Sequence, residues 1–325
     1  MKVSSDLITL LASPKKIILT SHQKPDGDAL GSTLALYGIL KKLNHQIEVI
    51  YPTDFPSYYH WMPFIKDTKI FNKKNHHSII VESDLVFYLD FNSIDRVEEM
   101  KDSFNESKAV KVMIDHHLQP AAIADYIYSD ATASSTAELI FDFIDAIHQK
   151  DLIDKDIAIC LYTGIVTDTG GFQFSSTREK THLIASFLLS KEIDIEFIFN
   201  QCYNNFSANR LRLFGYCLSE KMVLVNDKVA YICITEEEKK KFDIQEGDTE
   251  GLVNFPLKIC NIEVVALFKQ DHDKIKISFR SKGQNDVNAI AKKYFNGGGH
   301  KNASGGSSFK SMEETTALFT QCFNQ

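Results

Sequence analysis

The chain has 325 residues and a formal net charge of −7, from 36 Lys and Arg against 43 Asp and Glu. Hydrophobic residues make up 44% and charged residues 24%, which is typical of a globular protein, and the length favours two domains over one. The acidic balance argues against a protein that coats long nucleic acid, so an anionic ligand would need a local site.

The first 190 residues alternate between strand and helix patterns. Apolar runs predict strands, and helical stretches separate most of them; the predicted strands are Lys16–Thr20, Ile47–Tyr51, Leu85–Leu89 and Val110–Ile114. Helices are predicted from about Asp28 to Lys42 and from about Ser135 to His148. Ser135 and Glu138 fit a capping box at the start of the second helix. This order predicts an α/β fold with a doubly wound parallel sheet over residues 1–190.

The pattern changes after about residue 190. Residues 191–214 have mixed polarity and are predicted to form a helical connector. Residues 215–325 are predicted to form a second, smaller α/β domain, with one hairpin over 223–234 and a strand pair at 262–269 and 274–280. A helix over 287–295 then leads into a glycine-rich loop at 297–306.

Cysteine spacing and hydropathy indicate the compartment. Six widely spaced cysteines without a C-x-x-C pair argue against a zinc site and against a disulfide scaffold. Asp6 interrupts the N-terminal apolar stretch, and no segment approaches the roughly 18 apolar residues of a membrane span. We therefore expect a cytoplasmic protein without a membrane segment. A homodimer is compatible with the sequence, which does not specify the oligomeric state.

Acidic residues and histidines gather directly after the predicted strands. The first predicted strand leads into His22, Asp26 and Asp28. The third strand ends at Asp90 and the fourth at Asp115, His116 and His117. A further acid, Asp168, follows later in the chain. The carboxyl ends of parallel strands meet at one edge of a sheet, where ligands of such folds bind. Any one of these residues alone could be a helix cap or a surface side chain, but the recurrence at strand ends favours a shared site.

Charge balance predicts what this site holds. Several carboxylates buried together would each cost several kcal/mol to desolvate without compensation. Two divalent cations would neutralise four carboxylates. Mixed Asp and His ligands suit Mn²⁺, with Mg²⁺ or Co²⁺ as alternatives, better than a metal that prefers thiolates.

These motifs resemble those of the DHH phosphoesterase superfamily. The pattern His22-x-x-x-Asp26-x-Asp28-x-x-Gly31-Ser32 is similar to its first motif, Asp90 to its second, Asp115-His116-His117 to its third and Asp168-Thr-Gly to its fourth. The glycine-rich segment from Gly297 to Gly306, which includes Gly298, Gly299 and His300, resembles the loop of the DHH-associated domain in the RecJ-like branch. The two-domain length is most similar to the NrnA-type oligoribonucleases, which also hydrolyse 3′-phosphoadenosine 5′-phosphate (PAP).

The resemblance implies a role for each motif residue. His22, Asp26 and Asp90 would bind one metal ion, and Asp28, Asp90, His116 and Asp168 the other, so that Asp90 bridges. Asp115 would support the histidine pair, and His117 would face the scissile phosphate. Arg280, His300 and the backbone amides of Gly298 and Gly299 would bind substrate phosphate.

The implied activity is hydrolysis of short single-stranded RNA, of two to a few nucleotides, from the 5′ end to mononucleotides, and of PAP to AMP. A metal pair would activate a water and stabilise both the attacking and the leaving oxygen. Two alternatives stay open: a phosphodiesterase for cyclic di-AMP or pApA with the same site, and a non-catalytic nucleotide sensor. A sensor would be marked by the loss of a ligand residue, and every motif position is filled.

Overall fold

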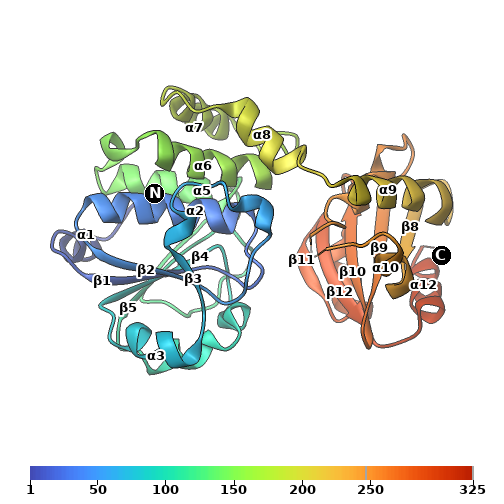
Figure 1. The fold of residues 1–325 in the computed structure, drawn as a ribbon, viewed down its shortest axis with the longest axis horizontal. Helices are drawn as coiled ribbons and strands as arrows, with labels where there is room; N and C mark the ends of the chain where they lie inside the picture. Colours follow the sequence, from blue (N-terminus) through green and yellow to red (C-terminus); the bar gives the residue numbers. More distant parts are fainter. Residues whose placement is uncertain (246, 324–325) are drawn as a thin grey trace. The chain divides into compact units, whose positions relative to one another are not determined.

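The computed structural model describes residues 1–245 and 247–323. The chain divides into two compact units, residues 1–205 and residues 206–325 (Figure 1). Within the described part of the chain, no helix combines the length and the apolar composition that crossing a membrane requires.

The first unit contains a six-stranded sheet with the order β3-β2-β1-β4-β5-β6, and every neighbouring pair is parallel. The strands are β1 (Lys16–Thr20), β2 (Gln46–Tyr51), β3 (Thr68–Ile70), β4 (Leu85–Leu89), β5 (Val110–Asp115) and β6 (Tyr126–Ser129). This confirms the predicted doubly wound sheet. The two edge strands, β3 and β6, were not predicted.

Helices cover both faces of this sheet. They are α1 (Ser5–Leu11), α2 (Gly27–Lys42), α3 (Lys73–Val81), α4 (Met100–Glu106), α5 (Thr136–Ala146), α6 (Lys155–Asp168), α7 (Glu179–Leu189) and α8 (Ile195–Tyr203). Ile17 and Leu19 of β1 pack into the core formed with α2, α5 and α6, whereas Ile18 packs with α3 and α4 on the opposite face. Figure 1 shows α2, α5 and α6 on one side of the sheet and α3 on the other. Alternate strand residues thus enter different cores, as the pleat requires.

The order of the strands determines where a ligand site is expected. From β1 the chain moves to β2 and β3 on one side of it, and it returns to β4, β5 and β6 on the other. The carboxyl ends of β1 and β4 therefore flank a topological switch point, where open α/β sheets bind their ligands.

Three glycines allow α2 and α6 to approach each other and the start of α5 closely. A Cβ at Gly27 would lie 2.4 Å from the Thr167 hydroxyl, and one at Gly31 would lie 2.5 Å from the Cys160 carbonyl oxygen. A Cβ at Gly164 would lie 2.6 Å from that of Ala137. Gly27 is thus the first residue of a closely packed helix.

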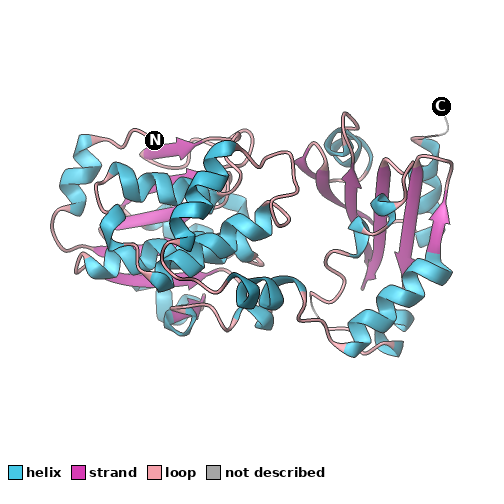
Figure 2. Ribbon diagram, turned by 90° about the horizontal axis from the view of Figure 1, so that it is seen from above, coloured by secondary structure: helices cyan, strands magenta, loops and turns pink. Residues whose placement is uncertain are grey.

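The second unit contains a mixed sheet with the order β11-β12-β10-β9-β8-β7. Its strands are β7 (Met222–Leu224), β8 (Val229–Ile234), β9 (Val264–Asp271), β10 (Lys274–Ser281), β11 (Gly298–His300) and β12 (Ala303–Ser308). Both predicted antiparallel pairs are present, and a parallel pairing of β8 with β9 joins them. Figure 2 distinguishes these strands from the helices by colour.

Helices also flank the second sheet, with α11 and α12 packed against one face. The helices of this unit are α9 (Ala208–Tyr216), α10 (Glu236–Lys241), α11 (Val287–Tyr294) and α12 (Met312–Gln321). Ala291 and Phe319 share a core with Phe268 of β9, while Leu213 of α9 packs into the other core. The two helices of the predicted connector, 191–214, thus belong to different units, because Ile198 of α8 lies in the core of the first.

Candidate metal centre

The loop after β1 supplies three of the expected ligands. His22 and Asp28 are buried, and Asp26 is the N-cap of α2. Oδ1 of Asp26 accepts hydrogen bonds from the backbone N–H groups of Asp28 and Ala29, at 3.0 and 3.1 Å. Asp26 therefore caps the helix and also belongs to a donor group with His22 and Asp90, whose ligand atoms lie within 4.8 Å of one another.

Asp90 lies at the centre of the cluster, directly after β4. Its Oδ2 is 3.4 Å from Nε2 of His22, and its Oδ1 is 3.6 Å from Nε2 of His116. A second donor group consists of Asp28, Asp90 and His116. Asp90 is thus shared by two sets of atoms that could hold a metal ion, and it belongs to a third with Asp115 and His117.

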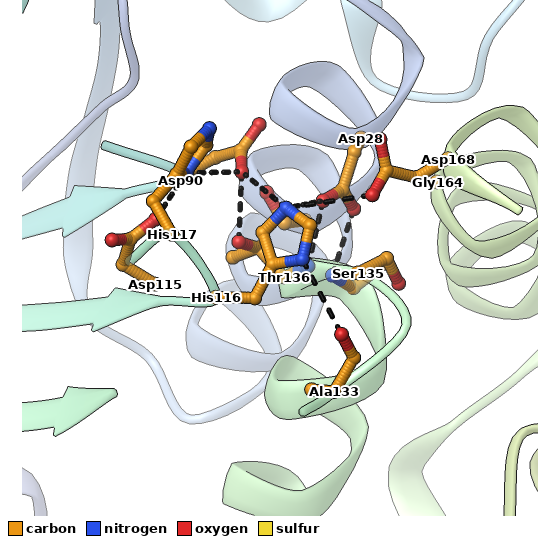
Figure 3. Close-up of polar contacts among 12 residues, drawn as sticks. Asp28, Asp90, Asp115, His116, His117, Ala133, Ser135, Thr136, Gly164 and Asp168 are labelled. Carbon is orange, nitrogen blue, oxygen red and sulfur yellow. Dashed lines mark hydrogen bonds and ion pairs between the residues drawn. The ribbon is translucent and has the colours of Figure 1, made fainter. Parts of the chain in front are cut away.

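The end of β5 supplies Asp115, His116 and His117. Nε2 of His116 is 3.4 Å from Oδ2 of Asp168, at the end of α6, and 3.9 Å from Oδ2 of Asp28 (Figure 3). The ring of His117 binds Asp115 through Nδ1 at 2.7 Å. Asp115 thus contacts His117, whereas Nδ1 of His116 lies 3.4 Å from the carbonyl oxygen of Ala133.

Burial and mutual repulsion shift the carboxyl pKa values in this cluster. Desolvation, together with the charges of Asp90, Asp168 and Asp26, raises the pKa of Asp28 well above its usual value. Desolvation, opposed by His116 but reinforced by Asp26 and Asp90, raises the pKa of Asp168 to about 7. The pKa of Asp90 is lowered instead, because hydrogen bonding to His22 and the charges of the histidines outweigh its burial.

The pKa values of His117 and His22 are raised, although burial alone would lower them. Desolvation favours neutral His117, but the hydrogen bond to Asp115 and the charge of Asp90 outweigh it and raise its pKa to about 9. The pKa of His22 is also raised, because Asp90 and Asp26 outweigh its burial. Without a metal ion, the cluster therefore binds protons that a cation would displace.

The donor set fits divalent cations. Oδ2 of Asp115 is buried without a hydrogen-bond partner among the described residues, and Asp28 and Asp168 resist ionisation on their own. Carboxylate oxygens and imidazole nitrogens with Asp90 in common could hold two ions, as the sequence predicted.

We expect the contribution of Asp168 and His117 to the stability of the metal-free protein to fall as pH rises from about 4 to about 9. Asp168 has a folded-state pKa of about 7 against an ordinary 3.8, and His117 one of about 9 against 6.5. In those intervals the folded state binds more protons than the unfolded state, so stability decreases with pH. Mn²⁺ bound at Asp168 would displace its proton, so the stabilising increment of Mn²⁺ should grow between about pH 4 and about pH 7. Thermal unfolding with EDTA or Mn²⁺ across this range measures both trends, and a pH-independent increment would contradict them.

The N-terminus of α5 contributes to the site, which the sequence does not predict. The backbone N–H groups of Thr136 and Ala137 donate to the two Asp28 oxygens, at 2.6 and 2.8 Å. The Thr136 hydroxyl donates to Oδ1 of Asp90 at 2.8 Å. Only the position of Thr136 one residue after a helix cap could have suggested this role.

The predicted capping box at Ser135 is only half correct. Ser135 does cap α5, and its hydroxyl accepts from the Glu138 N–H at 3.0 Å. The buried Glu138 carboxylate turns instead to Ser134, Thr181 and Arg178, at 2.6, 2.7 and 2.6 Å. Glu138 therefore ties the start of α5 to α7, because a buried carboxylate requires such partners.

The substrate-binding candidates Arg280, Gly298, Gly299 and His300 all belong to the second unit. Arg280 and His300 both pair with Ala303, from opposite sides of β12, so they stand in one row of the sheet. Residues paired in this way have side chains on the same face. The predicted glycine-rich loop is largely a strand pair, β11 and β12. Gly299 has a φ of 140°, and a Cβ there would lie 2.7 Å from the Ala303 carbonyl oxygen, so close strand pairing requires this glycine.

The fold and the site define a class: a parallel α/β domain with carboxylates and histidines at its strand ends, followed by a mixed-sheet domain. The chain belongs to the DHH family. The model of the DHH family N-terminal domain matches residues 16–165, and that of the DHHA1 domain matches residues 226–325.

Three relatives resemble the chain over nearly its whole length. It is 31% identical to the probable bifunctional oligoribonuclease and PAP phosphatase NrnA of Streptococcus mutans, over 97% of both chains. It is 29% identical to the bifunctional oligoribonuclease and PAP phosphatase NrnA of Bacillus subtilis, over 94% of this chain and 93% of the relative. The crystal structure of an exopolyphosphatase-related protein from Bacteroides fragilis has a TM-score of 0.93 and 42% identity, covering 97% of this chain and 94% of that one. These matches confirm the predicted family, fold class and enzyme class, a hydrolase of phosphate esters.

Proposed function

We propose that the chain hydrolyses very short single-stranded oligoribonucleotides from the 5′ end to mononucleotides, and PAP to AMP and phosphate. The observation that carries this proposal is the carboxylate of Asp90, which two sets of ligating atoms share. The names of the relatives from S. mutans and B. subtilis support the substrate class.

We propose that one metal ion is bound by His22, Asp26 and Asp90. The proposed ligands of the second are Asp28, Asp90, His116 and Asp168. Mn²⁺ suits mixed carboxylate and imidazole ligands, with Mg²⁺ and Co²⁺ as the ions to compare. When bound, such ions lower the pKa of a water and stabilise charge on phosphate oxygens.

His117 is the residue that we expect to face the scissile phosphate. In the metal-free protein its pKa is raised to about 9, so the ring is there an imidazolium at neutral pH. Asp115 holds the proton on Nδ1, so the second proton is on Nε2. This cation can bind a phosphate oxygen, and its proton can neutralise charge on the leaving oxygen.

Arg280, His300 and the amides of Gly298 and Gly299 are the proposed phosphate-binding groups of the second unit. We expect Arg280→Ala to raise KM for pApA about 10- to 100-fold with a smaller change in kcat, because a guanidinium binds phosphate in the ground state and the transition state alike. Steady-state kinetics measures this. Lys276→Ala removes another cation from β10, one whose ammonium binds Asp271, and should leave KM unchanged. Equal effects of the two substitutions would contradict the assignment.

The test of substrate class is a set of reactions with the purified protein and Mn²⁺. The set comprises 5′-labelled RNAs of increasing length, PAP, cyclic di-AMP and inorganic polyphosphate. We expect fast release of AMP from the dinucleotide and from PAP, and a rate that falls with RNA length. Preference for cyclic di-AMP or polyphosphate would overturn the proposed substrate but not the enzyme class. Binding without hydrolysis would favour a nucleotide sensor. A cytoplasmic location and a homodimer stay predictions.

A further inference from the structure

The carboxylate of Asp90 is held in one orientation by its surroundings. The residue has a left-handed backbone, with φ at 64°, a conformation that is uncommon for residues other than glycine. Its N–H donates to the Ile114 carbonyl at 3.2 Å. In the side chain, Oδ2 faces His22 and Oδ1 faces His116, so each oxygen lies beside a different donor set.

The side chain of Thr136 binds one of these two oxygens, Oδ1. It is fully buried, and its hydroxyl donates to Oδ1 of Asp90 at 2.8 Å (Figure 3). Its backbone N–H donates to Oδ2 of Asp28 at 2.6 Å. One residue therefore contacts both aspartates of the second donor set, Asp28 and Asp90.

The position of Thr136 is itself fixed. It is the first residue of α5, directly after the Ser135 cap, and Glu138 in the same turn is tied to Thr181 and Arg178. These contacts hold the start of the helix in place, and with it the backbone from which the Thr136 hydroxyl reaches Asp90. Ligand-orienting hydrogen bonds of this kind tune metal sites.

We propose that Thr136 is a positioning residue that fixes the plane of the Asp90 carboxylate, so that its two oxygens are divided between the two donor sets. This inference rests on the metal-dependent function proposed above. Without the hydroxyl, the carboxylate can rotate, and its two oxygens then no longer face one donor set each. The binding of two ions would then become weaker and less uniform.

Thr136→Val tests this with little change in shape. The methyl group that replaces the hydroxyl preserves side-chain volume, and the backbone N–H to Asp28 is retained. Thr136→Ser restores the hydroxyl and serves as the rescue. Thr315→Val is the matched control, because Thr315 is fully buried and its hydroxyl donates to Ser308 at 2.9 Å in the second unit.

The primary readout is Mn²⁺ alone, measured by calorimetric titration and by the electron paramagnetic resonance signal of coupled Mn²⁺ pairs. We expect Thr136→Val to bind Mn²⁺ about 10- to 100-fold more weakly and to lose the signal of the coupled pair. Thr136→Ser and Thr315→Val should stay close to the wild type. Kinetics with pApA should show a lower kcat with KM little changed, and thermal unfolding with EDTA establishes that each variant is folded.

The outcomes separate this inference from the proposed function. A wild-type protein that fails to bind two Mn²⁺ ions would overturn the metal-dependent function. A wild type that binds two ions, with Thr136→Val indistinguishable from it, would overturn the role of Thr136 alone. The same is true if Thr315→Val or Thr136→Ser weakens Mn²⁺ binding as much as Thr136→Val does.

Discussion

Asp168→Asn should lower the rate of pApA hydrolysis at least about a thousand-fold while making the metal-free protein more stable at about pH 8. The rate falls because a metal ion contributes several kcal/mol of transition-state stabilisation, and the substitution removes a charged ligand. The stability rises because burial, reinforced by Asp26 and Asp90, disfavours the ionised carboxylate of Asp168 and raises its pKa to about 7. A neutral amide does not carry this penalty and should add about 1 kcal/mol to the free energy of unfolding.

These opposite effects distinguish a ligand from a structural residue. Steady-state kinetics and thermal unfolding with EDTA measure them, and Mn²⁺ should stabilise the variant much less than the wild type. Asp156→Asn is the control, since Asp156 is an exposed residue of the same helix, α6. If Asp168→Asn lowers the stability of the metal-free protein, the Asp168 carboxylate stabilises the fold and does not act mainly as a metal ligand.

Asp90→Asn should have the largest effect on metal binding of any single substitution in the cluster. Its two oxygens contact His22 on one side and His116 on the other, so the loss of its charge weakens both donor sets. We expect the affinity for both Mn²⁺ ions to fall at least about 100-fold and hydrolysis of pApA to become undetectable.

A comparison with His22→Gln makes this prediction specific. His22 contacts Asp90 through Oδ2 only and belongs to the donor group with Asp26 and Asp90, so its loss should affect one ion and leave the other bound. Calorimetric titration with Mn²⁺ gives the number of bound ions for each variant. Retention of one tightly bound ion by Asp90→Asn would show that Asp90 is not shared between the two.

The sequence predicts those parts of the fold that depend on local pattern. Buried strands such as β1, β4 and β5 are continuous apolar runs, which parallel sheets require. The edge strand β3 is short and mixed in polarity, so its sequence shows no strand signal. The strand β12 contains Gly305 and Gly306, which disfavour strands; it forms because β10 pairs with it. Propensity is overridden there by tertiary pairing.

For the site, the sequence predicts the acidic residues and histidines better than the residues that hold them in place. Asp28, Asp90, His116 and Asp168 come together as expected, because strand ends and a neighbouring helix place them at one edge of the sheet. The role of Thr136 was not predictable, since its partner Asp90 is 46 residues away and only the fold joins them. Likewise, the contact of Gly27 with Thr167 depends on how α2 and α6 pack.

The most direct measurement is the Mn²⁺-dependent hydrolysis of 5′-labelled pApA by the purified protein, with EDTA and the Asp168→Asn variant in parallel. If the enzyme uses two metal ions, each pApA is converted to two AMP in the presence of Mn²⁺, and no conversion occurs with EDTA or in the variant. Intact pApA bound to the Mn²⁺-loaded protein, or hydrolysis that persists in EDTA, would contradict it.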